Sequence, residues 1–328
     1  MQTQIKNQYD NEIHKLILKV CHQIELPLHF NWKGPKTFTN NQRVALLLLR
    51  ERWNMSFQRF VKHLCETKWP RWLGLRDLPG KSTLHDWAKL FGMDKIRRFF
   101  SQLLTKEKPS VMALDGTGLD SYHRSRHYEW RVQAERTPHV KLDILIDVET
   151  MLVHDFCTRI RPRHDIIFAN SSCRRLKHRN ILMLADGAYD SEPLHEILKS
   201  RGNELYAPVR KSSRRFPKGR NRRRCLEKHP KYNKRSLVES TFSVIKKRFG
   251  PLKAKSHFMK KREMALRMVV YNMERIIKIA KAIINIIQNL FRTWPSILDI
   301  VLLELFALPH FYSPISFVLP LKNETKLL

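Results

Sequence analysis

The stretch YNKRSLVESTFSVIK, residues 232–246, decides how the rest of the chain is interpreted. Four of its polar residues stand at helical spacing: Tyr232, Arg235, Glu239 and Lys246. At about 100° per residue they fall within an arc of roughly 60° on a helical wheel. Beside them runs an apolar stripe made of Val238, Phe242, Ile245 and Phe249. The pattern predicts a helix that packs its apolar stripe on a core and projects the polar arc beside it.

Glu239 has two interpretations. Ser236 and Glu239 fit a capping box, in which the glutamate reaches back to the serine amide and serves only the helix. Alternatively, Glu239 belongs to a functional arc together with the tyrosine, the arginine and the lysine. The residues of the stretch alone leave both interpretations open.

The spacing Y-x2-R-x3-E-x6-K resembles the signature of insertion-sequence DDE transposases, the group that includes the insertion-sequence four and five families. The resemblance implies that Glu239 is the third acidic ligand of a catalytic metal pair. It implies that Tyr232, Arg235 and Lys246 contact the DNA end. It also requires two aspartates upstream, each at the end of a strand.

Two aspartates end apolar runs and are each followed by glycine. Asp115 follows the run in SVMALDGTGL, residues 110–119, and Asp186 follows ILMLA, residues 181–185. Each run predicts a buried strand with a carboxylate at its end. The main rivals are Asp143 and Asp147, which share the polar face of another predicted strand. We choose Asp115 and Asp186 because each ends an apolar run and precedes glycine.

The segments from residue 110 onward predict an α/β fold. Three strands form an antiparallel meander: one within 110–119 that ends in a turn after Asp115, one at 139–147 and one at 151–160. A helix, a buried strand at 181–185, a second helix and a strand at 204–209 follow. The order β-β-β-α-β-α, taken with the resemblance, indicates a ribonuclease-H-like core with a mixed five-stranded sheet.

Three regions divide the chain. Residues 1–105 contain several short helices with cap signals at Thr39 or Asn40, at Ser56, and at Ser82 or Thr83. We interpret this region as helix-turn-helix-like and DNA-binding; the alternative is a helical bundle that only supports the core. Residues 106–290 form the catalytic domain, which ends in a long helix predicted at 260–291. Residues 291–328 form an apolar tail of uncertain role.

The net charge of the chain indicates what kind of molecule it binds. The 328 residues include 62 Lys and Arg against 30 Asp and Glu, a formal net charge of +32. Such a surplus indicates a polyanion, and nucleic acid in particular, because solubility requires far less charge. Within the basic segment 210–231, Arg222, Arg223 and Arg224 are candidate phosphate contacts. The alternative is a charged loop exposed to solvent.

The remaining composition bears on location. The five cysteines, at 21, 65, 157, 173 and 225, are scattered and form no CxxC motif, which favours free thiols in a reducing compartment over a zinc site. The N-terminus lacks the apolar run of a signal peptide. A glutamate and two prolines interrupt the apolar segment 300–319, so we expect no membrane span. With the resemblance, we expect a cytoplasmic, nucleoid-associated protein of a prokaryote.

The resemblance implies two Mg²⁺ or Mn²⁺ ions held by Asp115, Asp186 and Glu239. Such ions prefer oxygen ligands, and a pair can serve both the attacking and the leaving oxygen of a phosphoryl transfer. It implies cleavage at transposon ends and joining of the 3′-ends to target DNA, by a homodimer or larger synaptic assembly. The alternatives are a DNA-binding relic without cleavage and a ribonuclease-H-like nuclease without strand transfer.

Overall fold

The computed structural model describes residues 2–30, 36–105, 107–121, 140–160, 164–210 and 216–293. The chain forms two compact units, Met1–Lys278 and Ile279–Leu328. The first unit contains a set of N-terminal helices and a β-sheet. The second contains the C-terminal end of the long helix α12 (His257–Thr293). Almost all of the predicted tail, 291–328, lies outside the described residues.

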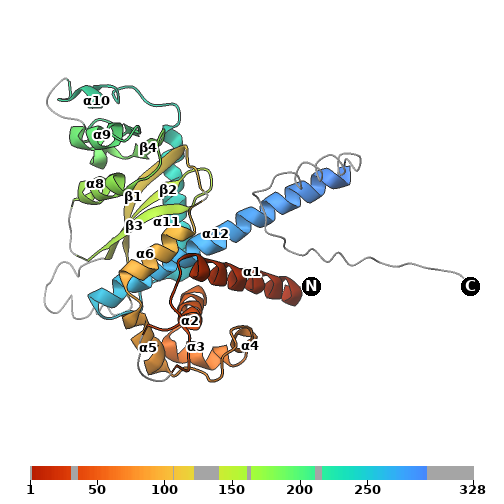
Figure 1. Cartoon of the computed structure of the whole chain (residues 1–328). Helices are drawn as coiled ribbons and strands as arrows, with labels where there is room; N and C mark the ends of the chain where they lie inside the picture. Colours follow the sequence, from red (N-terminus) through yellow and green to blue (C-terminus); the bar gives the residue numbers. More distant parts are fainter. Residues whose placement is uncertain are drawn as a thin grey trace, which may run out of the picture. The chain divides into compact units, whose positions relative to one another are not determined.

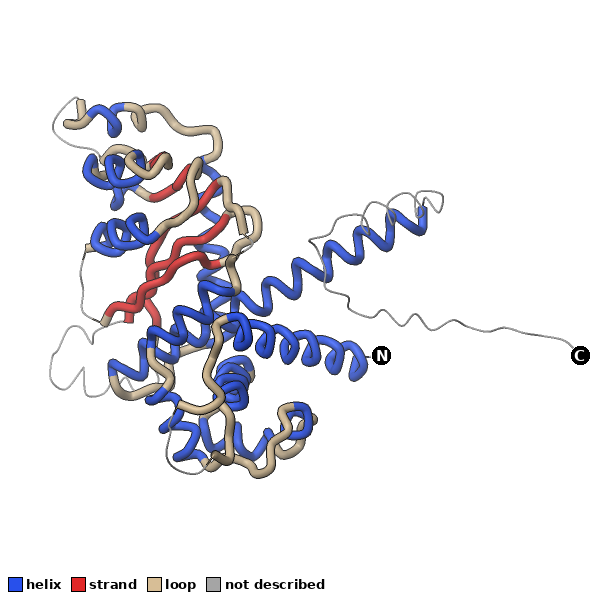
Figure 2. The backbone as a smooth tube through the Cα atoms, viewed as in Figure 1, coloured by secondary structure: helices blue, strands red, loops and turns tan. Residues whose placement is uncertain are grey.

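A mixed five-stranded sheet lies at the centre of the first unit (Figure 2). Its strands, in the order β3-β2-β1-β4-β5, are β1 (Val111–Leu119), β2 (Val140–Asp147), β3 (Val153–Arg159), β4 (Leu182–Ala185) and β5 (Glu204–Tyr206). β1, β2 and β3 pair antiparallel, whereas β4 pairs parallel to β1 and β5 pairs parallel to β4. The predicted ribonuclease-H-like topology is confirmed.

Helices cover both faces of the sheet (Figure 1). On one face, α8 (Asp165–Arg175) and α9 (Glu192–Lys199) enclose a buried cluster that includes Met112, Leu114 and Met183. On the other lie α11 (Leu237–Phe249) and α12. Asn272 of α12 donates to the Val153 carbonyl at 2.8 Å and accepts from its amide at 3.0 Å, which joins α12 to the edge strand β3.

The end of β1 differs from the prediction. The strand does not end at Asp115 but continues through two glycines to Leu119. It continues because β2 pairs with it along this whole length, up to Leu119 opposite Val140. Only the parallel pairing with β4 stops before Asp115, at Leu114 opposite Ala185. The carboxylate therefore stands where β1 loses one of its two neighbours.

Before the sheet, the described residues form six helices: α1 (Gln2–Gln23), α2 (Asn40–Arg52), α3 (Phe57–Leu64), α4 (Trp69–Trp72), α5 (Lys81–Leu90) and α6 (Met93–Gln102). Thr39 caps α2 in a capping box with Gln42, and Ser56 caps α3, both as predicted. The predicted cap of α5 at Ser82 or Thr83 is wrong, because the helix already begins after Gly80. The sequence patterns did not predict α4 and α6.

A buried ion-pair network joins these helices to α12. Arg267 is 1% exposed, and its guanidinium lies 3.5 Å from Glu51 of α2 and 2.6 Å from Glu263 of α12. Removing one member of such a network leaves an uncompensated buried charge. The network therefore fixes α2 against α12, and the N-terminal helices share one compact unit with the sheet.

Candidate active site

The site begins where the parallel pairing of β1 and β4 ends. Leu114 is paired with Ala185, and neighbouring strands of a sheet lie about 4.8 Å apart, so the residues that follow, Asp115 of β1 and Asp186 just after β4, start side by side. The Asp115 carboxylate accepts from the Gly116 amide at 2.7 Å. Asp186 caps the short 3-10 helix η1 (Gly187–Tyr189) and accepts from the Ala188 amide at 2.8 Å.

The stretch 232–246 forms two helical segments. Residues Tyr232–Ser236 form a 3-10 helix, η2, which leads into α11. The predicted apolar stripe of Val238, Phe242, Ile245 and Phe249 is buried. The capping-box interpretation is wrong, because the Ser236 side chain makes no capping hydrogen bond and Glu239 binds an arginine instead. Packing of the stripe turns the polar arc toward Asp115 of β1 and the end of β4.

Arg235 brings the three acids together. Its Nη2 donates to Asp115 Oδ2 at 2.8 Å, and its Nη1 donates to Glu239 Oε1 at 2.9 Å. The same Nη2 lies 3.9 Å from Asp186 Oδ2. One guanidinium thus joins carboxylates from β1, from the residue after β4 and from α11. The Asp115 side chain is 15% exposed, Asp186 37% and Glu239 59%, so the cluster opens to solvent through Glu239.

The two rival aspartates lie elsewhere. Asp143 is fully buried and binds Arg159, whose Nε lies 2.6 Å from Asp143 Oδ2. Asp147 holds the β2–β3 turn by accepting from the Glu149 and Thr150 amides, each at 3.2 Å. Both carboxylates have structural partners and neither contacts Arg235 in the part of the chain that the structure describes.

Close packing explains why residue 116 is a glycine. A Cβ at this position would lie 2.5 Å from Asp143 Oδ1 and 2.8 Å from Lys141 Cε. Asp115 and Gly116 point to opposite faces of the sheet, as successive strand residues do. The glycine therefore leaves room for the buried Asp143–Arg159 pair directly behind the site.

Burial and charge set the protonation of the cluster. Burial raises the pKa of Asp115, and the nearby Asp186 and Glu239 raise it further, whereas the Gly116 amide and Arg235 oppose this rise. Burial disfavours the charged form of Arg235, but the three carboxylates outweigh it and raise the arginine's pKa. Arg235 therefore stays protonated and compensates part of the negative charge.

The donor set suits a hard divalent ion. Three carboxylates offer oxygen ligands of the kind that Mg²⁺ and Mn²⁺ take. Among the described residues, however, no three His, Cys, Asp or Glu side chains lie close enough to hold a metal ion as they stand. At this site the Arg235 guanidinium instead binds Asp115 and Glu239 and lies 3.9 Å from Asp186.

The other signature residues flank the acids. Lys246 Nζ donates to Thr117 Oγ1 at 2.7 Å, on the same face of β1 as Asp115 and two residues further on. The Tyr232 ring packs edge-on against Tyr206 at the end of β5, with ring centroids 5.1 Å apart. Burial raises the pKa of Tyr232, so its hydroxyl keeps its proton at neutral pH. Tyr232 and Lys246 thus stand on either side of the acids.

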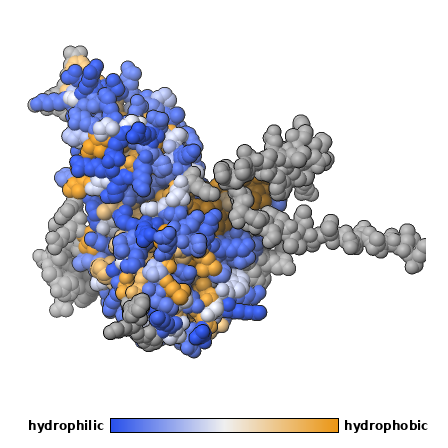
Figure 3. Space-filling model, in the orientation of Figure 1, coloured by the Kyte–Doolittle hydropathy of each residue, from blue (hydrophilic) through white to orange (hydrophobic). Residues whose placement is uncertain are grey.

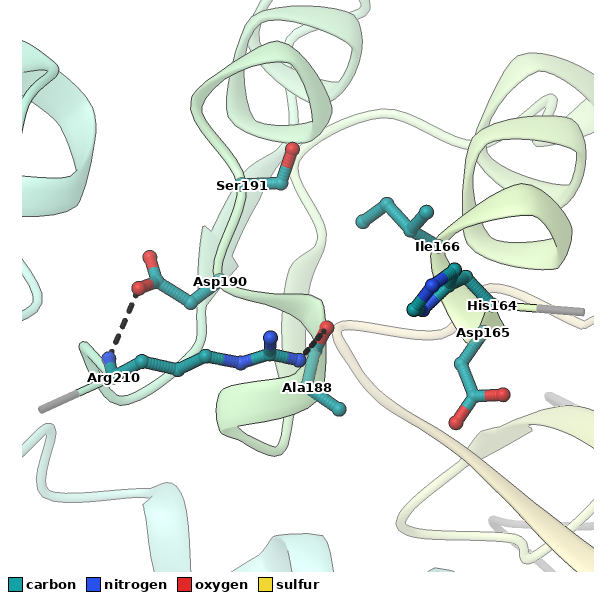
Figure 4. Close-up of a pocket in the computed structure, with 7 residues that line it drawn as sticks. All are labelled: His164, Asp165, Ile166, Ala188, Asp190, Ser191 and Arg210. Atoms are coloured by element: carbon teal, nitrogen blue, oxygen red, sulfur yellow. Dashed lines mark hydrogen bonds between the residues drawn. The ribbon is translucent and has the colours of Figure 1, made fainter. Parts of the chain in front are cut away.

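Arginines from the basic segment brace the turn after Asp186. A pocket of about 580 Å³ lies beside this turn (Figure 4). Along one side of it, Arg210 donates from Nη2 to the Ala188 carbonyl at 2.8 Å and from its amide to Asp190 at 3.0 Å (Figure 4). Arg222 donates from Nε and Nη2 to the same Asp190 carboxylate, each at 2.6 Å. The sequence patterns missed this brace, because its partners stand 20 to 32 positions apart.

The predicted basic trio therefore divides into two kinds. Arg222, in the short helix α10 (Arg220–Arg223), is engaged with Asp190, whereas Arg223 and Arg224 are exposed. Hydrophilic residues predominate over α8, α9 and α10 on the face drawn in Figure 3. The exposed pair can reach a phosphate without breaking an ion pair in the described structure.

A ribonuclease-H-like sheet with acids converging where the pairing of β1 and β4 ends defines a class of protein, the metal-dependent polynucleotidyl transferases and endonucleases. A family model described as "Transposase DDE domain" matches residues 106–273, just over half of the chain. The chain belongs to this family and is a DNA transposase that depends on a divalent metal.

The chain is similar to the piggyBac transposase in a cryo-EM structure of its synaptic complex with hairpin DNA. The TM-score is 0.44 at 12% identity, with 83% of this chain and 73% of that chain covered. No curated protein matches the chain. None of the helices in the described residues is long and apolar enough to cross a membrane.

Proposed function

We propose that Asp115, Asp186 and Glu239 are the catalytic carboxylates and that they hold two Mg²⁺ ions, or Mn²⁺ in their place. The observation that carries this proposal is their convergence on Arg235 from three separate elements. When bound, a pair of divalent ions supplies an activated water or 3′-hydroxyl and stabilises the charge on the leaving oxygen. The reaction is cleavage at the ends of an insertion sequence and joining of the 3′-ends to target DNA.

The residues around the acids position the DNA end. Lys246, anchored near Asp115 through Thr117, offers a cation to a phosphate beside the scissile bond. Tyr232 offers a neutral hydroxyl that donates to a phosphate oxygen. Arg235, the arginine of the signature, offers a fork of donors that binds a phosphate through two parallel hydrogen bonds. Each of these roles requires contact with the DNA backbone rather than with the bases.

Further contacts extend the interface along the DNA. Exposed Arg223 and Arg224 neutralise phosphates, and Arg222 holds their segment in place through Asp190. The helices α1–α6, within 1–105, carry the recognition of the element's ends, while the core at 106–290 contacts phosphates. A homodimer or larger assembly is the working form, because two ends must be joined in one event.

The test compares single variants on a DNA duplex carrying the terminal repeats that flank the gene. Asp115→Asn, Asp186→Asn and Glu239→Gln should each lower Mg²⁺-dependent cleavage by roughly three orders of magnitude, because each loses ligation worth several kcal/mol in the transition state. Binding of the duplex should stay within a few-fold of the wild type.

Glu196→Gln, on the exposed surface of α9, is the matched control and should cleave normally. Wild-type protein that binds the ends but cleaves nothing with Mg²⁺ or Mn²⁺ would support a DNA-binding relic. Cleavage without joining to a target would support a nuclease. Full activity in any of the three carboxylate variants would remove that residue from the proposed set.

A further inference from the structure

The position of the Arg235 guanidinium relative to the acids has a consequence for the order of binding. Two of its nitrogens are held by Asp115 and Glu239 within 3 Å, and Asp186 lies within 4 Å of one of them. A metal ion bound by the same carboxylate oxygens would face a fixed positive charge at the same place. Like charges at such separations repel strongly, above all in a site that is partly removed from water. The guanidinium and the metal pair therefore exclude each other.

The arginine is incompletely satisfied in this position. Its Nε is buried and has no hydrogen-bond partner among the described residues. A buried donor without an acceptor lowers the stability of the arrangement that holds it. The three carboxylates hold the side chain through its Nη atoms alone, so an arrangement that also satisfies Nε competes with the present one.

A phosphate of the DNA end offers that arrangement. The planar guanidinium has donors on Nε and both Nη atoms, and it binds a phosphate through two parallel hydrogen bonds. Arg235 stands within the 3-10 segment η2, on the same polar arc as Tyr232 and Lys246. A DNA backbone that meets those two residues also comes within reach of the arginine.

We infer that Arg235 is an internal counter-cation that closes the metal site of the free protein and opens it when a DNA end takes the guanidinium. The inference rests on the proposed roles of the three carboxylates. It makes DNA binding precede metal binding, so the DNA-free enzyme does not carry a loaded cleavage site. Because binding linkage is reciprocal, bound metal also raises the affinity for the DNA end.

The experiment measures Mn²⁺ binding to the full DNA-free chain, by the electron paramagnetic resonance signal of free Mn²⁺. Wild-type protein should bind weakly. Arg235→Gln should bind Mn²⁺ roughly 5- to 150-fold more tightly, the usual range of such coupling. Lys234→Gln removes the same charge from an exposed neighbour and should behave as the wild type. Arg235→Lys, which keeps the charge but lacks the fork, should fall between the two and covers the case in which the glutamine variant does not fold.

A second series separates this inference from the proposed function. Adding Asp115→Asn to the Arg235→Gln variant should abolish the gained affinity if the ions bind at the acids. If wild-type protein with a DNA end binds Mn²⁺ in an Asp115-dependent way but DNA-free Arg235→Gln binds no better than wild type, the counter-cation inference is overturned and the metal site stands. If Asp115→Asn changes Mn²⁺ binding in neither setting, the proposed metal site is overturned and the inference with it.

Discussion

Lys246 of α11 donates a hydrogen bond to Thr117 of β1 at 2.7 Å, across 129 positions of sequence. Thr117 stands two residues beyond Asp115 on the same face of the strand. The contact therefore fixes the ammonium group at a constant distance from the acids. A lysine held in this way contributes its charge at one place along the DNA, unlike the mobile lysines of an open surface.

Lys246→Gln should weaken binding of the DNA end roughly tenfold, the effect of losing one charged hydrogen bond of about 1.5 kcal/mol. Lys247→Gln removes the same charge from the adjacent exposed residue and should change end binding far less. Fluorescence anisotropy on the end duplex and on a random duplex measures both effects. Equal losses in the two variants would show that Lys246 contributes only general charge.

The salt dependence of binding tests the basic segment. The double variant Arg223→Gln with Arg224→Gln should reduce the slope of log K against log salt by up to about 1.8, since each phosphate contact contributes roughly 0.9. An unchanged slope would remove these residues from the DNA interface. Affinities over a series of salt concentrations measure the slope.

Arg222→Gln should behave differently from that pair. Its loss deprives the buried Asp190 carboxylate of its charged partner, so the free energy of unfolding should fall by about 1–3 kcal/mol. The pKa of Asp190 is held below its usual range largely by the Arg222 hydrogen bonds, although burial opposes this. Thermal melting measures the loss. A variant that melts like the wild type would show that the Arg222–Asp190 ion pair does not stabilise the fold.

Two glycines of β1 provide a test variant and a matched control. Gly116→Ala should destabilise the protein by about 1–3 kcal/mol, because its Cβ would overlap Asp143 and Lys141 and force the buried pair to shift. Gly118→Ala meets nothing within 4 Å and should lie within about 0.5 kcal/mol of the wild type. Urea denaturation of both variants measures the difference. Similar values for the two would show that the space behind Asp115 is not restricted.

Asp115→Asn should stabilise the metal-free protein at neutral pH. The pKa of Asp115 is raised on folding, so its contribution to stability is present below the ordinary carboxyl value near 3.9 and is lost as pH rises through the raised pKa. At pH 7 the ionised carboxylate therefore lowers stability, and a neutral asparagine relieves this. Melting temperatures of both proteins between pH 4 and 7 should converge toward acid pH, whereas a less stable asparagine variant at pH 7 would contradict the sign.

Local patterns predicted much of the fold. Apolar runs marked β1 and β4, and Thr39 and Ser56 marked the starts of two helices, because caps and strand periodicity depend on neighbouring residues. The end of β1 was mispredicted for the same reason. A glycine suggests a turn when only its neighbours are considered, but pairing with β2, some 27 positions away at Gly116 and Asp143, keeps the strand extended.

The sequence by itself determined the membership of the candidate site: the aspartates after two apolar runs and the spacing of Tyr232, Arg235, Glu239 and Lys246 all stand in the order of residues. Only the tertiary structure decided how they are used. It placed Arg235 among the three acids, paired Arg222 with Asp190 and buried Asp143 behind Gly116. Each of these outcomes depends on which charges meet after distant segments have packed, because burial removes the water that would otherwise stabilise them and makes the choice of partner decisive.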